Sequence, residues 1–183
     1  GLTIIWIQTC SPEEIFEILK TIFPDSILEI DSELPTESLI VIDPLKINEL
    51  SLFLRDNEDL RFDSLMNLSG VDDDNGEKTT EEDGTITTKG GTFSVYYHLH
   101  STILNHKVTL KVSTNRNKPE VESVDKIWKA STWHEREAYD MYGIVFLNHP
   151  DLRRILLPED WDGFPLRKDY ENPEFYDGMK IPY

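Results

Sequence analysis

The sequence predicts an α+β fold, with a mixed or antiparallel sheet of about five or six strands, helices packed on one face and an extended C-terminal arm. Two segments alternate apolar and polar residues, as strands with one buried face do. Two others begin with the residues of a helix capping box. Five of the ten prolines lie at or after residue 150. We therefore expect an α+β domain at residues 1–146 and the arm at residues 147–183.

The chain begins with a predicted strand and helix. Residues 2–7 form an apolar run typical of an opening strand. Ser11 and Glu14 then make a capping box, with Pro12 at the first helical position. Pro24 ends this helix. Its apolar stripe consists of Ile15, Phe16, Ile18, Leu19, Ile22 and Phe23.

Two strands and a second helix follow, which makes the order of the first third β-α-β-β-α. The strands are predicted at residues 27–30 and 38–42, separated by an acidic turn that contains Pro35. Asp43-Pro44 starts the helix. Its candidate core residues are Leu45, Leu50, Leu52, Phe53 and Leu54. These segments indicate a packed domain, and no chemistry.

Residues 72–91 are the most polar part of the chain, and they follow a strand predicted within residues 62–71. The run DDDNG at residues 72–76 invites comparison with a calcium-binding EF-hand loop. It lacks the third alternate carboxylate before the glycine, and no predicted helix flanks it. We therefore expect a solvated insertion loop or a mobile hairpin.

Residues 93–100 and 107–113 predict an antiparallel hairpin, because apolar and polar residues alternate in both segments. His98 and His100 share one face of the first strand, and His106 could approach them across the turn. Zinc needs three or four convergent ligands, and no carboxylate or cysteine stands beside these histidines. We expect solvent-facing histidines and no metal site.

Residues 128–170 combine aromatic residues, charges of both signs and turn residues more densely than any other stretch. A short helix predicted at residues 124–129 leads into it. Thr132 and Glu135 make a second capping box, and Gly143 stands where a left-handed residue ends a helix. The stretch thus starts with a helix that has both ends marked.

The charged residues of this helix indicate ion pairs and not catalysis. His134-Glu135 begins like the zinc-protease motif H-E-x-x-H, but the second histidine is missing. Glu135 and Glu137 lie on different sides of a helix, so they cannot act as a facing acid and base. Arg136 and Asp140 have the i,i+4 spacing of an ion pair. We expect no active site in this chain.

The arm is too aromatic for a disordered linker, although its prolines exclude long regular elements. Arginine and aromatic side chains carry much of the binding energy at interfaces. We therefore expect the arm to contact another chain, the alternative being an arm wrapped on its own domain. The candidate residues for such contacts or for structural ion pairs are Glu135, Arg136, Glu137, Asp140, Arg153, Arg154, Trp161 and Arg167.

Composition excludes several classes of function. The 35 acidic and 18 basic residues give a net charge of −17, which opposes binding to nucleic acid or to an anionic membrane surface. The single cysteine, Cys10, cannot hold an iron–sulfur cluster by itself. No apolar run approaches the length of a transmembrane helix, and the first residues lack the layout of a signal peptide.

Two parts of the dense stretch, EREAYDMYGI and HPDLRRILLPEDWDGFPLRKDY, resemble the signature of a known family. It is the 30-kDa-type (C) subunit of respiratory complex I, the proton-pumping NADH:quinone oxidoreductase. The resemblance runs almost without gaps over residues 119–170. Weaker similarity lies at SGVD, residues 69–72, and at residues 95–113.

The resemblance implies an accessory structural subunit of the hydrophilic arm of this complex. It implies docking against the quinone-site subunit, of the 49-kDa type, and against adjacent iron–sulfur subunits. NAD, FMN, iron–sulfur clusters and quinone would lie in partner subunits, with no redox centre in this chain. The chain would reach the membrane only through the complex, on the cytoplasmic face of a bacterial membrane or the matrix side of the mitochondrial inner membrane.

Two alternatives stay open at this point. Related subunits occur in membrane-bound hydrogenases and in complexes with electron donors other than NADH, and the chemistry that separates them lies in other chains. The second alternative is a free-standing metal-binding enzyme that uses His98, His100 and the acidic loop.

Overall fold

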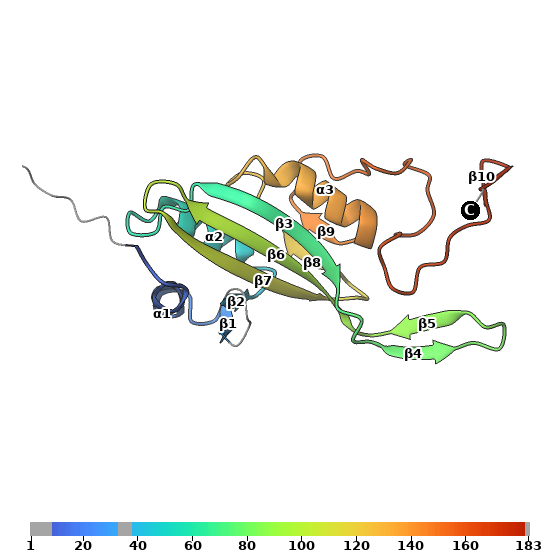
Figure 1. The fold of residues 1–183 in the computed structure, drawn as a ribbon, viewed down its shortest axis with the longest axis horizontal. Helices are drawn as coiled ribbons and strands as arrows, with labels where there is room; N and C mark the ends of the chain where they lie inside the picture. Colours follow the sequence, from blue (N-terminus) through green and yellow to red (C-terminus); the bar gives the residue numbers. More distant parts are fainter. Residues whose placement is uncertain (1–8, 33–37, 182–183) are drawn as a thin grey trace, which may run out of the picture.

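A five-stranded sheet forms the centre of the computed structural model, which describes residues 9–32 and 38–181 (Figure 1). In spatial order its strands are β1 (Ile27–Asp31), β2 (Leu39–Ile42), β7 (His106–Asn115), β6 (Thr92–Ser101) and β3 (Ser64–Asp72). β2 and β7 are parallel, whereas the other neighbours are antiparallel. The predicted mixed sheet is confirmed. The strand predicted at residues 2–7 and the turn at Pro35 lie outside the described residues.

Alternation along β6 and β7 decides which face of the sheet is buried. Three apolar pairs lie directly opposite each other across these strands: Val95 with Val112, Tyr97 with Leu110, and Leu99 with Val108. Opposed residues share a face, and all six side chains are buried. They join buried residues of all three helices in one apolar core.

The first two helices are α1 (Pro12–Ile22) and α2 (Ile47–Asp56). The capping box at α1 is confirmed, since Ser11 Oγ accepts from the Glu14 N–H and the Glu14 carboxylate accepts from the Ser11 N–H. In α2, Leu50 and Leu54 are buried on one side of the helix. The core prediction was wrong for Leu45 and Leu52, which are 51% and 43% exposed. Leu45 precedes the helix, and Leu52 lies on its opposite side.

The third helix, α3 (Ser131–Tyr142), corrects two further predictions. Its N-cap is Ala130 and has no side-chain hydrogen bond, so the capping box of Thr132 and Glu135 is wrong. The Thr132 hydroxyl instead donates to Asp125, while Glu135 turns into the core. The helix predicted at residues 124–129 is a turn. Gly143 is confirmed as the left-handed terminator, with φ 75°.

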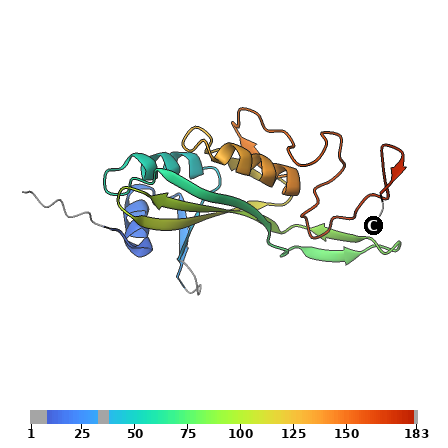
Figure 2. The ribbon, with the colours of Figure 1, turned by 45° about the horizontal axis from the view of Figure 1, so that its top comes forward.

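Three small two-stranded sheets complete the chain. The polar segment 72–91 forms a hairpin of β4 (Glu77–Thr80) and β5 (Ile86–Lys89), which projects beyond the main sheet (Figure 1). A parallel pair joins β8 (Glu120–Glu122) to β9 (Val145–Leu147). Near the end of the arm, β10 (Phe175–Tyr176) pairs with β11 (Met179–Lys180). Between β9 and β10, the arm is irregular and runs beside α3 (Figure 2).

Candidate functional site

A buried polar network surrounds α3, and Glu135 is its first member. The Glu135 carboxyl is inaccessible to solvent and accepts hydrogen bonds from Ser123 Oγ at 2.6 Å and from the Val124 N–H at 2.8 Å. Burial raises the pKa of Glu135 to about 7, although both hydrogen bonds favour the charged form. Glu135 thus joins the turn before α3 to the helix.

His149 lies beside this carboxyl. Its Nδ1 accepts from the Asp151 N–H at 3.0 Å, which leaves Nε2 to donate to the Thr132 carbonyl at 3.2 Å. The same Nε2 is 3.8 Å from Glu135 Oε2. Burial is the largest cause of the raised pKa of Glu135, and the nearby charge of Asp125 adds to it.

Asp140, further along α3, binds the start of the arm. Its Oδ2 accepts from the N–H groups of residues 155, 156 and 157 at 3.1, 2.7 and 3.1 Å. Its Oδ1 accepts from Arg154 Nη1 at 2.9 Å, in a pair whose side chains are 0% and 9% exposed. Asp140 therefore pairs with Arg154, and the predicted ion pair with Arg136 is wrong.

Arg136 contacts the backbone of the arm instead of a carboxylate. Its Nε donates to the Arg153 carbonyl at 3.2 Å, and its guanidinium carbon lies 5.0 Å from the ring centroid of Trp133. The Trp133 side chain is 63% exposed. Glu137 is exposed on the same helix, while Arg153 pairs with Asp151 at the surface.

A second buried ion pair lies at the end of β3. Arg116 donates to Asp72 at 2.9 Å and to Asp169 at 2.6 Å, and Asp72 accepts from the Lys168 N–H at 2.9 Å. Burial raises the pKa of Asp72, but the hydrogen bonds from Lys168, Asp74 and Arg116 outweigh it and hold that pKa below its usual value. This pair attaches residues 168 and 169 of the arm to the sheet.

Arg167 lies between two aromatic rings. Its guanidinium carbon is 4.9 Å from the centroid of Phe93 and 4.6 Å from that of Phe164, and its Nε donates to the Tyr142 carbonyl at 2.7 Å. Burial, together with the nearby charge of Arg116, lowers the pKa of Arg167. The stack closes the arm over the end of α3.

The structure gathers most of the predicted charged residues around α3. Those in contact with the arm or belonging to it are Arg136, Asp140, Arg154 and Arg167, whereas Glu135 binds the turn before the helix. Of the other three, Trp161 donates to Tyr170 at 3.0 Å. Glu137 and Arg153 lie at the surface. Every contact given above is made within the chain, so a role in contacts with other chains stays a prediction.

Sequence reasoning missed Asp72, Arg116 and Asp169. Asp72 and Arg116 are separated by 44 positions, and Arg116 and Asp169 by 53. No local spacing marks such partners, because the fold alone brings them together.

The three histidines of the hairpin do not converge. His106 is buried, with Nδ1 accepting from the Cys10 N–H at 3.1 Å and Nε2 2.6 Å from the Leu60 carbonyl. It stands opposite Ser101, and so points to the core face, whereas His98 and His100 point to the other face. The prediction that His106 approaches His98 and His100 was wrong. Among the described residues, no three His, Cys, Asp or Glu side chains could hold a metal ion.

Two solved structures share this fold. A trypsin-resistant fragment (1–134) of Nqo5 aligns with a TM-score of 0.55 and 22% identity, over 75% of this chain and 98% of that chain. A chain of the membrane-bound sulfane sulfur reductase, an archaeal respiratory membrane complex, aligns with a TM-score of 0.63 and 18% identity, over 87% of this chain and 85% of that chain. At these identities the likeness places the chain in a fold class, the α+β fold of these two proteins.

Sequence relatives identify the family. The model of the family "Respiratory-chain NADH dehydrogenase, 30 Kd subunit" matches residues 40–176. The C subunit of NADH-quinone oxidoreductase from Chlorobium phaeobacteroides is 40% identical over 92% of this chain and 93% of its own length. The C subunit from Chloroherpeton thalassium is also 40% identical, and the chain spans 65% of its length. The chain therefore belongs to the 30-kDa subunit family of respiratory-chain NADH dehydrogenase, and it is a subunit of complex I.

A longer relative carries the letters of two subunits in its name. The C/D subunit of NADH-quinone oxidoreductase from Bacteroides fragilis is 42% identical to this chain over 139 residues. The alignment covers 75% of this chain and 25% of that protein. Within the described ranges, every helix is too short or too polar to cross a membrane.

Proposed function

We propose that this chain is an accessory structural subunit of the hydrophilic arm of complex I, and that it supports electron transfer from NADH to quinone without a redox centre of its own. One observation carries the proposal: buried carboxylates bind the C-terminal arm to α3 and to the sheet. Asp140 binds three consecutive N–H groups of that arm, and Asp72 binds one through Lys168. Such a network positions a surface, and each buried carboxylate of the described residues has a hydrogen-bond partner.

The surface that this network positions is apolar. We define the α3 surface as the exposed side chains of Trp133, Glu137, Leu156 and Leu166. The three apolar members are 63%, 62% and 50% exposed. Leu156 donates its N–H to Asp140, and Leu166 donates its own to the Met141 carbonyl, so both are fixed beside α3. An exposed aromatic residue among aliphatic ones is typical of an interface.

The partner proposed for the α3 surface is the quinone-site subunit of the 49-kDa type, which is the D subunit of these complexes. The C/D relative supports this choice, because the name of that one protein bears the letters of both subunits. Adjacent iron–sulfur subunits would bind the remaining arm, where Arg153 and Trp161 lie. Through these partners, the chain would lie on the cytoplasmic face of a bacterial membrane or the matrix side of the mitochondrial inner membrane.

The alternative is an equivalent subunit of a membrane-bound hydrogenase or of another complex with a different electron donor. The family match supports NADH, since the matching relatives are NADH-quinone oxidoreductase subunits. NADH-dependent quinone reduction by the complex that contains this chain is the assay that separates the two.

The test replaces two residues of the α3 surface, as Trp133→Ala with Leu156→Ser. We expect the fraction of the chain that comigrates with the 49-kDa-type subunit in native gels to fall about tenfold, because central apolar anchors contribute about 2 kcal/mol or more. Oxidation of NADH at the flavin site by the input module should stay intact. The matched control is Ile103→Ser, at a side chain 52% exposed on the β6–β7 turn.

Normal assembly of the double variant would refute the α3 surface as the docking site. Recovery of the wild-type chain alone, outside any large iron–sulfur assembly, would refute the function as a subunit itself. Loss of flavin-site activity with assembly preserved would also count against a purely structural function.

A further inference from the structure

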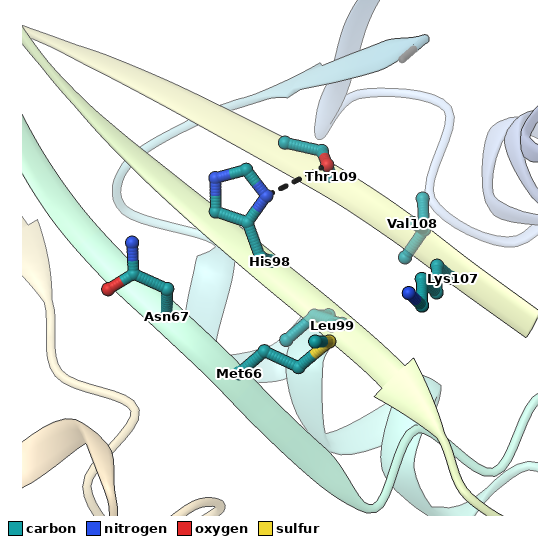
Figure 3. Close-up of a pocket in the computed structure, with 7 residues that line it drawn as sticks. All are labelled: Met66, Asn67, His98, Leu99, Lys107, Val108 and Thr109. Carbon is teal, nitrogen blue, oxygen red and sulfur yellow. Dashed lines mark hydrogen bonds between the residues drawn. The ribbon is translucent and has the colours of Figure 1, made fainter. Parts of the chain in front are cut away.

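Two further features lie away from the network around α3: a hollow on the outer face of the main sheet and the base of the β4–β5 hairpin. The hollow has a volume of about 340 Å³, and its lining includes Met66, Leu99 and Val108 (Figure 3). The histidine in it is already engaged, since His98 and the buried Thr109 are hydrogen-bonded to each other at 3.3 Å. The base of the hairpin, by contrast, contains a pair of residues that is chemically labile in proteins.

The chain enters the hairpin through Asn75 and Gly76 (Figure 1), and contacts at its base require both residue types. Asn75 binds the start of β6 twice, because its Oδ1 accepts from the Thr92 N–H at 2.8 Å and its Nδ2 donates to Thr92 Oγ1 at 3.1 Å. A Cβ at Gly76 would lie 2.6 Å from Thr88 Cγ2 and 2.8 Å from the Gly90 carbonyl oxygen. The side-chain amide and the missing Cβ are therefore both requirements of this fold.

An asparagine that is followed by a glycine is prone to lose its side-chain amide. The backbone nitrogen of the glycine attacks Cγ of the asparagine, and the new C–N bond closes a succinimide ring. Nδ2 leaves as ammonia, with the hydrogen that the attacking nitrogen gives up. Water then opens the ring at either carbonyl, which yields aspartate or isoaspartate. Glycine favours the attack because no Cβ hinders the approach of its nitrogen.

The structure adds two conditions that promote this reaction at Asn75. The residue is exposed and belongs to no helix or strand, so water reaches it and no regular ladder fixes its backbone. Its Oδ1, on which negative charge develops during attack on Cγ, accepts from the Thr92 N–H at 2.8 Å. A backbone N–H at this distance stabilises a developing oxyanion, as in the oxyanion holes of hydrolases.

We propose that Asn75 is a site of spontaneous deamidation, with water as the co-reactant and with aspartate and isoaspartate as the products. The reaction uses only the nitrogen of Gly76, the hydrogen bond from Thr92 and water, so no enzyme is required. The inference goes beyond the proposed function, because it does not depend on any partner subunit.

The products would disturb the base of the hairpin. Thr92 Oγ1 donates its hydrogen to Asp73 Oδ2 at 2.6 Å and accepts from Asn75. An aspartate at position 75 has no N–H to donate, so two carboxylates would compete for one hydroxyl hydrogen and repel each other. Isoaspartate would also lengthen the backbone where Gly91 stands so close to Gly76 that a Cβ on the former would lie 2.8 Å from the nitrogen of the latter. We therefore expect the hairpin to open at its base.

The direct test is incubation of the folded full-length chain at neutral pH, followed by peptide mass spectrometry and an assay for isoaspartate. Isoaspartate is diagnostic, because direct hydrolysis of the side chain does not produce it. We expect product at position 75 to form at least about tenfold faster than at Asn117, an exposed asparagine that precedes a lysine. The rate should rise with pH, because the attacking nitrogen must lose its proton. Asn75→Gln, which lengthens the side chain by a methylene, should remove the product.

An isoaspartate yield at position 75 no higher than at Asn117 would overturn the proposal. A rate in the folded chain well below the rate in the urea-unfolded chain would also overturn it, since the contact with Thr92 would then hinder the reaction.

Hydrogen exchange gives a second measurement, which tests the effect on the hairpin. Asn75→Asp has the composition of the aspartate product, and the amide hydrogens of β4 and β5 should exchange several-fold faster in this variant than in the wild type. Asn117→Asp makes the same charge change outside the hairpin and is the matched control. Exchange that is unchanged in Asn75→Asp, or raised equally in Asn117→Asp, would overturn the expected opening of the hairpin.

Discussion

The substitution Glu135→Gln should change how the stability of the isolated full-length chain depends on pH. Burial raises the pKa of Glu135 from its ordinary value of 4.5 to about 7. The folded state therefore holds a proton that the unfolded state releases in this interval. Stability from the protonated carboxyl is fully present below pH 4.5 and is lost as the pH rises to about 7. Above pH 7 the folded chain carries a buried carboxylate that only accepts from the Ser123 hydroxyl and the Val124 N–H in the hydrogen bonds described above.

The magnitude follows from the same two pKa values. The interval between 4.5 and about 7 corresponds to about 3 kcal/mol, at about 1.4 kcal/mol per pH unit. A glutamine cannot ionise, and it keeps an oxygen to accept from Val124 and an amide to donate to Ser123. Relative to the wild type, the variant should therefore gain about 3 kcal/mol of unfolding free energy between pH 5 and pH 8.

The assay is urea unfolding at several pH values, followed by tryptophan fluorescence, because Trp128 is buried and becomes exposed on unfolding. Groups that titrate in both proteins cancel in the difference between variant and wild type. The control is Glu137→Gln, which makes the same substitution on the exposed side of the same helix, and the pH dependence of Glu135→Gln should exceed that of this control. A difference independent of pH for Glu135→Gln would refute the argument from burial.

Three further predictions concern the contacts of the arm. Asp140→Asn should lower the unfolding free energy by about 3 kcal/mol, because it leaves the buried Arg154 without its carboxylate. Trypsin should also cut the arm of this variant faster. The control is Asp151→Asn, at a surface ion pair, which should change neither the unfolding free energy nor the rate of cleavage. Arg167→Lys should lower the unfolding free energy by about 1–2 kcal/mol in the same urea assay, because an ammonium cannot stack between two rings; no loss would contradict the stack. Gly143→Ala should lower the melting temperature more than Gly178→Ala does. Both glycines have φ near 75°, but only at Gly143 would a Cβ lie 2.7 Å from side chains of the arm. Equal melting temperatures would contradict this close approach.

Local patterns predicted the elements that depend on near neighbours. The capping box at Ser11 needs only Glu14, three residues along, and Gly143 needs only its own backbone freedom. Alternation in the β6–β7 hairpin predicted its buried face, because opposed residues are close in sequence. The second capping box failed, since tertiary contacts drew Glu135 toward Ser123 and Val124.

The candidate site was predictable in composition but not in pairing. A dense stretch of arginines, carboxylates and aromatics marked α3 and the arm, and a motif within it identified the family. The pairing of carboxylates with arginines was not predictable. Asp140 pairs with Arg154 of the arm and not with Arg136, which lies one helical turn before it. Burial of the helix face decided this, because a buried carboxylate needs several donors, and the arm supplies them.

The sequence by itself determined the fold class, the N-cap of α1, the C-terminal end of α3, the positions of β1, β2, β6 and β7, and membership of the 30-kDa subunit family. These depend on hydrophobic periodicity, capping and a contiguous motif, all of which act over short separations. Only the tertiary structure decided that Asp72 meets Arg116 and that His106 turns away from His98. The physical reason is that each depends on which face of the sheet meets the core, and strand register settles that over the whole domain.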